Sequence, residues 1–359
     1  MIRSLRHRWF INTEVAFVRS YRLRCGALLT ALAALLGVGC GSSSSTASPT
    51  VSVTPTATQG APTLANVASA GSLQLLMDKY IGPPFITATG DEYQNQSAGS
   101  VGLAQEIAAG ELTPNVFVPI GSAPMALVEP AFTTWAVQFA ASPLVVAYNP
   151  NGPYASQLKK IAAGKTPISD LFTLMATPGF KLGRTDPTTD SQGQGFVMMV
   201  QLAEQYLGVS ATTASAVLGG SDDSSEIFSE TALEPTLQAG ELDAASAYLP
   251  QAVQLGLPYV ALPDQINFGD PADVSIYEGA SMTLSTGKVV HGSLLDLEAS
   301  VLGTTSNPAT PAATAFVEFL LSSSTRDLLK RLGYTLLPPT LLGNAAAAPQ
   351  GIRTLTTSS

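Results

Sequence analysis

The sequence predicts an α/β protein with two domains. Short apolar segments with strand composition alternate with segments whose apolar residues recur at helical spacing, which is typical of parallel βαβ units. About 280 residues, from 63 to 342, lie between two segments of small and polar composition. That length is enough for two domains of ordinary size, each with its own core.

Residues 1–39 are expected to be a secretion signal rather than part of the fold. Six arginines accompany an apolar run, residues 26–38, that is shorter than the roughly 18 residues of a membrane span. Small residues then lead to Cys40, which resembles the lipobox of bacterial lipoproteins, although Gly37 stands where that motif usually has a branched residue. Processing as in that family would make Cys40 the acylated first residue and a membrane anchor. The alternative is a secreted protein without a lipid.

Two further segments are expected to lie outside the folded part. Residues 40–62 are rich in Ser, Thr and Pro, as in a flexible linker. Residues 343–359 are similarly small and polar and are expected to form a flexible tail.

Charge and cysteine content exclude several classes of function. The leader contains six of the 17 Lys and Arg residues and one of the 26 Asp and Glu residues, which leaves 11 basic and 25 acidic residues, a net charge of −14. Nucleic acid is therefore an unsuitable partner. An anion site in so acidic a chain must use hydrogen-bond donors and helix dipoles rather than a basic patch. Cys25 and Cys40 are the only cysteines, so the exported part has none for a disulfide or a zinc site.

The first half of the folded part begins with a short strand and two similar helix starts. Ser72 is expected to cap a helix over residues 72–80. Ala98-Gly99-Ser100-Val101 opens a second helix, which Gly110 closes. Buried strands are predicted from their apolar composition, and the predicted strands of this half are 66–69, 116–120 and 144–148.

The second half is organised around a polar loop, residues 183–193, that leads into an amphipathic helix over 194–207. The free N–H groups of a helix start suit an oxyanion. Pro235 in the first turn and Gly240 at the end indicate another helix over 234–239. The remaining predicted helices are 169–175 and a long helix or helix pair over 311–332, and the remaining predicted strands are 181–182, 244–248, 259–263 and 281–284.

Six motifs, taken in this order, resemble the tungstate- and molybdate-binding lipoproteins of ABC importers over nearly the whole folded part. They are Ala70-Gly71-Ser72-Leu73, Ala98-Gly99-Ser100-Val101, residues 135–140, Gly183-Arg184-Thr185-Asp186-Pro187 with Asp190, Gly240-Glu241-Leu242-Asp243 leading to Tyr248, and residues 256–263. The resemblance implies a two-lobed periplasmic-binding-protein fold of type II, in which each lobe is a mixed sheet flanked by helices. It places lobe 1 at 63–143 plus 265–342 and lobe 2 at 144–264, with crossings near 142–149 and 261–267.

The same resemblance implies which residues bind the ligand. Ser72 and Ser100 match the two hydroxyl ligands of the family from lobe 1. Asp190 matches the carboxylate of the lobe 2 loop, and Tyr248 matches the tyrosine beside the site.

One position departs from the family pattern. Members that surround the metal of the oxyanion with six oxygens have a Glu immediately before the tyrosine, where this chain has Ala247. A tetrahedral anion held by Ser72, Ser100 and the backbone N–H groups of residues 191–193, starting at Ser191, is easier to build. Asp190 would then orient the loop, because an ionised carboxylate beside an anion is costly in a desolvated cleft.

Other interpretations stay open at this point. Each serine could be a plain helix cap, and Tyr248 a core aromatic residue. A serine hydrolase would use Ser100 and His291, but the segment before Ser100 is polar where a nucleophile elbow needs a buried strand. Acidic pairs at 222–223 and at 270 with 273 lack the spacing of a calcium loop. The same fold could also bind sulfate, phosphate or a small organic anion.

The combined expectation is an exported solute-binding protein that captures molybdate or tungstate and delivers it to the permease of an ABC importer. It would catalyse nothing and need no cofactor or resident metal. We expect a monomer, held by a lipid on Cys40 to the outer face of the cytoplasmic membrane.

Overall fold

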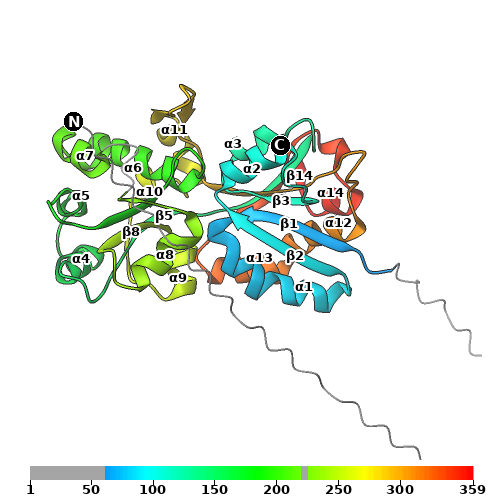
Figure 1. Ribbon diagram of the computed structural model, residues 1–359, viewed down its shortest axis with the longest axis horizontal. Helices are drawn as coiled ribbons and strands as arrows, with labels where there is room; N and C mark the ends of the chain where they lie inside the picture. Colours follow the sequence, from blue (N-terminus) through cyan, green and yellow to red (C-terminus); the bar gives the residue numbers. More distant parts are fainter. Residues whose placement is uncertain (1–60, 220–224, 359) are drawn as a thin grey trace, which may run out of the picture. The chain divides into compact units, whose positions relative to one another are not determined.

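The computed structural model describes residues 61–219 and 225–358, whose strands form two large sheets (Figure 1). The strand order is β14-β13-β4-β12-β3-β1-β2 in the sheet of lobe 1 and β7-β6-β8-β5-β9 in the sheet of lobe 2. The strands of lobe 1 are β1 (Leu64–Ala70), β2 (Glu92–Ala98), β3 (Val116–Val118), β4 (Trp135–Ala141), β12 (Asp296–Val301), β13 (Thr335–Gly343) and β14 (Thr357–Ser358). Those of lobe 2 are β5 (Leu144–Tyr148), β6 (Leu182–Thr185), β7 (Ile227–Phe228), β8 (Ala244–Tyr248) and β9 (Tyr259–Ala261).

Both sheets are mixed, as predicted. In lobe 1, β1 pairs in parallel with β2 and β3, whereas β12 runs antiparallel to β3 and β4. In lobe 2, β6 pairs in parallel with β7 and β8, whereas β5 runs antiparallel to β8 and β9. Helices flank both sheets (Figure 1), which confirms the α/β class.

Most helices follow the predicted pattern. The helices α2 (Ser100–Ala109) and α5 (Ser169–Met175) lie where they were expected, and Gly110 ends α2 in the left-handed conformation. The segment 311–332 is a helix pair, α12 (Pro311–Leu320) and α13 (Ser323–Arg331). The others are α1 (Gly82–Thr89), α3 (Ser122–Val128), α4 (Ala155–Ala162), α6 (Ser191–Leu207), α7 (Ala211–Leu218), α8 (Glu230–Gln238), α9 (Leu249–Leu255), α10 (Asp264–Asn267), α11 (Val274–Tyr277) and α14 (Gln350–Thr354). Four further helical segments are the 3-10 helices η1 (Gly71–Leu73), η3 (Pro271–Asp273) and η4 (Ala345–Ala347) and the π-helix η2 (Leu76–Ile81).

The helix α8 begins at Glu230, four residues before the predicted start at 234. Ser229 precedes it in the extended conformation of an N-cap residue, and Pro235 lies inside the helix rather than in its first turn. The earlier start turns two acidic side chains, Glu230 and Glu234, into the buried region between the lobes.

The chain returns to lobe 1 later than expected. The first crossing falls between β4 and β5, at residues 142–143. After β9, however, α10 and the hairpin of β10 (Ser281–Thr283) and β11 (Val289–His291) contact α6 of lobe 2. The buried side chains of Ile266 and Phe268 belong to this segment. The second crossing therefore lies just before β12, near residues 292–295, and the boundary at 265 is too early.

The segment after residue 343 has regular structure, contrary to the expected loose tail. Its helix α14 buries Ile352 completely, and Arg353 donates hydrogen bonds to the carbonyls of Ala346 and Ala348. The strand β14 then pairs in parallel with β13. One buried isoleucine and one arginine thus order the C-terminal segment, although its small and polar composition did not predict a packed structure.

No helix within residues 61–219 and 225–358 has the length and apolar character needed to cross a membrane. The predicted signal over 1–39, the lipidation site Cys40, nearly all of the linker and the acidic pair at 222–223 lie outside the described residues.

Candidate functional site

The two serines of the Ala-Gly-Ser motifs lie just beyond the C-terminal ends of two neighbouring strands of the lobe 1 sheet. Because β1 and β2 are parallel, with Ala70 opposite Ala98, Ser72 and Ser100 each follow a strand end by two residues. Both side chains are buried. The repeated motif therefore places one buried hydroxyl group just beyond the end of each of two neighbouring strands.

The two hydroxyl groups differ in their hydrogen bonds. Ser100 Oγ accepts a hydrogen bond from the N–H of Ile120 at 3.1 Å. Ser72 Oγ has no hydrogen-bond partner among the described residues, and it does not cap the turn η1 that contains it. The expected helix cap at Ser72 is therefore wrong, and its buried hydroxyl lies beside Glu230, whose ionised form it favours.

On the lobe 2 side, two helices begin where parallel strands end. The helix α6 follows β6, and α8 follows β7. The first N–H groups of a helix have no intrahelical partner and carry the positive end of the helix dipole, so such ends attract anions. The loop before α6 is the one that the sequence singled out for this reason.

Asp190 is the N-cap of α6. Its Oδ1 accepts a hydrogen bond from the N–H of Gln192 at 3.2 Å, whereas Oδ2 is buried with no partner in the described part of the chain. Burial raises the pKa of Asp190 to about 6, although the Thr185 hydroxyl and the helix N–H groups act in the opposite direction. Ser191 follows as the first helical residue, and its hydroxyl faces Gly121 of lobe 1, where an added Cβ would lie 3.7 Å away.

A network of buried amide side chains supports this helix start. Gln192 donates to Gln251 at 3.1 Å and accepts a hydrogen bond from Ser246 at 3.1 Å. Gln251 in turn accepts the N–H of Tyr248, also at 3.1 Å. The network ties α6 to β8 and α9, so the residues that face the cleft rest on a rigid base.

Tyr248 lies next to the same acidic groups. Burial raises the pKa of its hydroxyl, and the charges of Asp190 and Glu230 raise it further. Its hydroxyl has no hydrogen-bond partner within the described ranges. Ala247, one residue earlier, instead packs in the apolar core of lobe 2 with Leu233 and Leu237.

Two hydrogen bonds join the lobes at this place. The N–H of Gly71 donates to Glu230 Oε2 at 2.6 Å, and the N–H of Gly102 donates to the carbonyl of Thr189 at 2.9 Å. Each donor is in or beside an Ala-Gly-Ser motif. Both motifs of lobe 1 are thus in contact with lobe 2.

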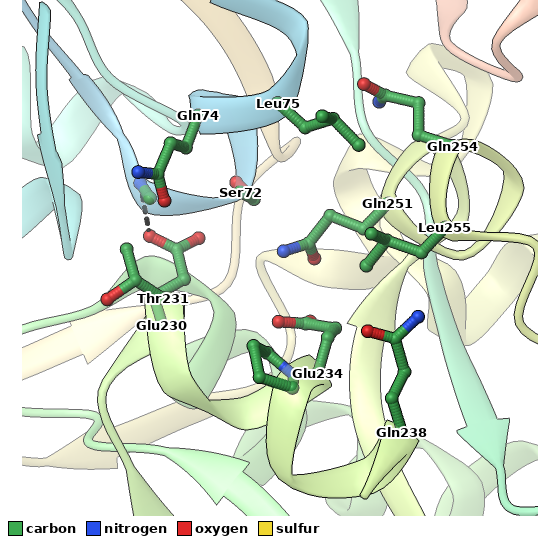
Figure 2. A pocket seen from close by; sticks show the side chains of 12 residues that line it. Ser72, Gln74, Leu75, Glu230, Thr231, Glu234, Gln238, Gln251, Gln254 and Leu255 are labelled. Atoms are coloured by element: carbon green, nitrogen blue, oxygen red, sulfur yellow. Dashed lines mark hydrogen bonds between the residues drawn. The ribbon is translucent and has the colours of Figure 1, made fainter. Parts of the chain in front are cut away.

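Two cavities between the lobes share Glu230 in their linings. One is lined by Ser72, Glu230, Glu234 and Gln251, among others (Figure 2). The other is lined by Gly99, Thr189, Asp190 and again Glu230. The lobes therefore enclose a polar region in which hydroxyl groups, carboxyl groups and helix starts meet.

Glu230 and Glu234 are the cleft residues that the sequence prediction missed. Both are buried, and burial raises the pKa of Glu234 to about 8 and that of Glu230 well above its usual value. A signal was present, because Ser229 is a good N-cap and Leu233 and Leu237 have helical spacing. Pro235 was instead assigned to the first turn, which hid both residues.

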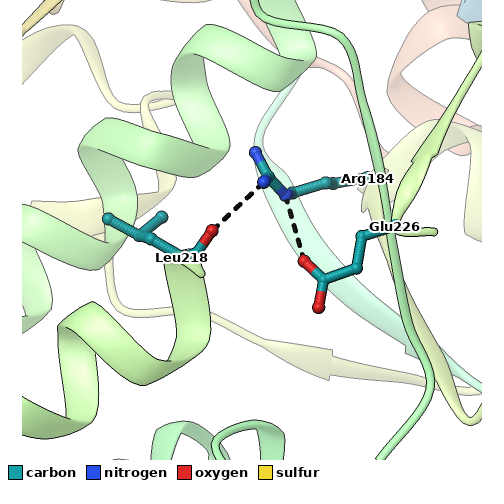
Figure 3. A network of polar contacts seen from close by, with 3 residues as sticks. All are labelled: Arg184, Leu218 and Glu226. Carbon is teal, nitrogen blue, oxygen red and sulfur yellow. Dashed lines mark hydrogen bonds and ion pairs between the residues drawn. The ribbon is translucent and has the colours of Figure 1, made fainter. Parts of the chain in front are cut away.

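Arg184, part of the predicted anion loop, lines neither of these cavities. It is fully buried in β6, where its Nε lies 3.4 Å from Glu226 Oε2 and its Nη2 donates to the carbonyl of Leu218 at 3.1 Å (Figure 3). These contacts place its charge at the C-terminus of α7, which is a favourable position for a cation.

The hydrolase and metal interpretations gain no support. His291 is exposed on β11, and no hydrogen bond joins it to Ser100 in the described ranges. Asp270 accepts the N–H of Ala272 in a turn. No group of three or more His, Cys, Asp or Glu residues within the described part could hold a metal ion.

Two lobes, each with a mixed sheet, that enclose polar groups between them define a class of ligand-binding proteins. The chain belongs to the bacterial extracellular solute-binding protein family, whose model matches residues 65–335. A Haloferax volcanii protein, named as a molybdenum-binding protein of an ABC transporter, is 30% identical over 276 residues, which cover 77% of this chain and 82% of the relative. The molybdate/tungstate-binding protein WtpA of Pyrococcus abyssi is 26% identical over 281 residues, which cover 72% and 79%.

A solved structure has the same fold. The periplasmic molybdate-binding protein of Azotobacter vinelandii matches with a TM-score of 0.51 and 15% sequence identity, over 77% of this chain and 99% of that protein. The family and the fold that the motifs implied are therefore confirmed.

Proposed function

We propose that this protein captures molybdate or tungstate between its two lobes and delivers it to the permease of an ABC importer. The observation that supports the ligand class is that Ser72 and Ser100 follow the paired ends of β1 and β2 on lobe 1, with Gly99 of the second motif packed against Thr189 and Asp190 at the N-terminus of α6 on lobe 2. Hydroxyl and N–H donors on both sides suit an oxyanion. The names of the relatives from Haloferax volcanii and Pyrococcus abyssi favour molybdenum and tungsten.

The anion would be held by donors rather than by a cation. Ser72, Ser100 and the N–H groups of residues 191–193 would bind its oxygens, while Asp190 holds the loop through its bond to Gln192. Closure brings the donors of both lobes to one anion, so ligand binding shifts the population toward the closed form. Exclusion of water then strengthens each hydrogen bond.

The remaining expectations belong to the same proposal. The protein would bind without catalysis, act as a monomer outside the cytoplasmic membrane, and be anchored there by acylation of Cys40. Mass spectrometry of the exported protein would test the anchor, because an N-terminal peptide that begins with unmodified Cys40 contradicts it.

Ligand identity can be tested by thermal unfolding of the purified full chain with molybdate, tungstate, sulfate or phosphate and without ligand. Free ligand at about 100 times its dissociation constant stabilises a protein by about 2.7 kcal/mol, which is several degrees for lobes of this size. We expect a shift with molybdate and tungstate. A shift with sulfate or phosphate alone would assign another anion to the same cleft, and no shift would contradict an oxyanion ligand.

The double variant Ser72→Ala and Ser100→Ala tests the site. We expect it to lose the ligand-induced shift while its circular dichroism stays that of the wild type. Ser322→Ala is the matched control, because Ser322 caps α13 away from this cleft through the N–H of Thr325. It should lose some stability but keep the shift, and an intact shift in the double variant would remove both serines from the site.

A further inference from the structure

One carboxyl oxygen of Glu230 accepts a hydrogen bond, and the other accepts none from the described residues. Its Oε2 accepts the N–H of Gly71 across the cleft at 2.6 Å. Its Oε1 is buried and has no hydrogen-bond partner in the described part of the chain. Glu230 is 4% exposed and lines the cavity shown in Figure 2 as well as the second cavity between the lobes. An unpartnered oxygen thus lies in the region where the ligand is proposed to bind.

Burial and the neighbouring charges disfavour a negative charge on this carboxyl, whereas the hydroxyl and the backbone N–H of Ser72 favour one. The groups that act on it as charges are acidic, namely Asp190 at the start of α6 and Glu234 on the same helix. The other titratable neighbours are the hydroxyls of Tyr248 at the end of β8 and Tyr334 just before β13. Burial is the largest effect, and it outweighs the opposing effect of Ser72, so the pKa of Glu230 lies well above its usual value. An anion arriving beside it would disfavour ionisation further.

We propose that Glu230 binds the oxyanion in its protonated form, with the Oε1 hydroxyl donating a hydrogen bond to an oxygen of the ligand. This inference rests on the proposed function. The position of the proton follows from the geometry, because Oε2 already accepts the N–H of Gly71 and only Oε1 is free to carry and donate it. A neutral carboxylic acid is a useful donor at a buried anion site. Glu230 thereby contacts the ligand and joins both lobes at once.

The proposal requires proton uptake on capture. Where the carboxyl is ionised before binding, it takes one proton from solvent as the anion enters and returns it when the anion leaves, and no bond within the anion breaks. Affinity for an unprotonated dianion should therefore rise as the pH falls. Asp190 lies in the same cleft, so part of the dependence can come from that residue.

The test is isothermal titration of the full chain with tungstate from about pH 6 to about pH 8.5, in buffers of different ionisation enthalpy. We expect the wild type to take up protons and to lose up to about tenfold in affinity per pH unit. Glu230→Gln carries a permanently neutral amide that can both accept and donate. It should keep most of the affinity at low pH, with a smaller pH dependence and less proton uptake.

Two further variants complete the design. Glu230→Ala lacks both hydrogen bonds and should bind tungstate at least about tenfold more weakly, about 1.4 kcal/mol. Glu111→Gln neutralises an exposed carboxyl just after α2 and should match the wild type throughout. An unchanged pH dependence in Glu230→Gln would overturn the proposal. A second result would also overturn it. If Glu230→Gln did not bind tungstate and the affinity of the wild type rose with pH, the ionised carboxylate would be the form that binds.

The wild-type titration separates this inference from the proposed function. If tungstate and molybdate do not bind but sulfate or phosphate does, the proposed ligand is wrong. The role of Glu230 is then tested by titrating the same variants with the anion that binds. Binding of none of these anions would overturn both.

Discussion

Two glycines explain, at the scale of single residues, why the Ala-Gly-Ser motif occurs twice. A Cβ on Gly71 would lie 2.7 Å from Glu230 Oε2, and a Cβ on Gly99 would lie 2.5 Å from the carbonyl oxygen of Thr189. Both neighbours belong to lobe 2. The serine of each motif places a buried hydroxyl just beyond a strand end, and the glycine before it lets the two lobes approach.

Substitution of Gly99 should therefore impair closure. Its neighbour is backbone, which cannot rotate away as a side chain can, so Gly99→Ala should hold the lobes apart. We expect ligand affinity to fall about tenfold or more, about 1.4 kcal/mol, and small-angle X-ray scattering to show a larger radius of gyration with ligand than in the wild type. Gly102→Ala is the control, since its Cβ would make an ordinary contact of 3.6 Å with Thr189. Equal behaviour of the two variants would contradict the closure argument.

Sequence motifs predicted many of the candidate site residues, but not all of them. The matching motifs named Ser72 and Ser100, and the register of β1 with β2 places each of them two residues beyond the end of a neighbouring strand. Glu230 escaped because its place in the cleft depends on where α8 begins, which Pro235 obscured. The two cross-lobe contacts join residues far apart in the chain, and local patterns do not report such contacts. The ligand roles of Ser72, Ser100, Asp190, Ser191 and Tyr248 stay predictions.

At the scale of elements, the start of α6 depends on its cap and on close packing. Gln194 donates to the carbonyl of Pro187 at 2.9 Å, which holds the loop against the helix. Gly193 packs so close to β6 that an added Cβ would lie 2.4 Å from the carbonyl oxygen of Thr185. The N-terminus of α6 is thus a rigid feature, as a binding site requires.

Two substitutions of Asp190 would measure how much its N-cap hydrogen bond contributes to the free energy of unfolding. Asn keeps an acceptor for the N–H of Gln192, whereas Ala does not. Asp190→Ala should therefore be less stable than Asp190→Asn by about 1 kcal/mol, measured by urea unfolding without anions. Ser210→Ala, which removes the cap of α7 on the surface, should cost a similar amount relative to the wild type. Equal stability of the Asn and Ala variants would show that the cap is unimportant.

Elements with strong local patterns were predicted well. The buried strands β5 and β8 have the predicted bounds because their residues are uniformly apolar or small. The strand β2 was missed since it lies at the sheet edge, paired with β1 alone, and has mostly polar, partly exposed residues. The lobe to which α10 and the hairpin β10–β11 belong depends on contacts with α6, which no local pattern encodes.

At the scale of the whole molecule, an acidic chain buries carboxyl groups where its lobes meet. Glu234 is 3% exposed, and its pKa is raised from 4.5 to about 8 by burial and by Asp190. The unfolded chain ionises this group near its usual pKa, whereas the folded chain keeps it protonated up to about pH 8. The folded state therefore binds more protons between these values, so its stability must fall as the pH rises through this window.

The melting temperature should accordingly decrease from about pH 5 to about pH 8.5, and Glu234→Gln should make this decrease smaller. A shift of this size corresponds to a few kcal/mol, or several degrees in melting temperature, and calorimetry at constant ionic strength without anions would measure it. The variant should be at least as stable as the wild type at high pH, because it no longer buries a charge. Asp190, Glu230 and the buried pair Asp296 and Glu298 on β12 also have raised pKa values, so part of the slope persists. If the melting temperature of Glu234→Gln depended on pH as that of the wild type does, Glu234 would have solvent access in the folded protein. Glu111→Gln is the control, because its side chain is exposed and its curve should run parallel to that of the wild type.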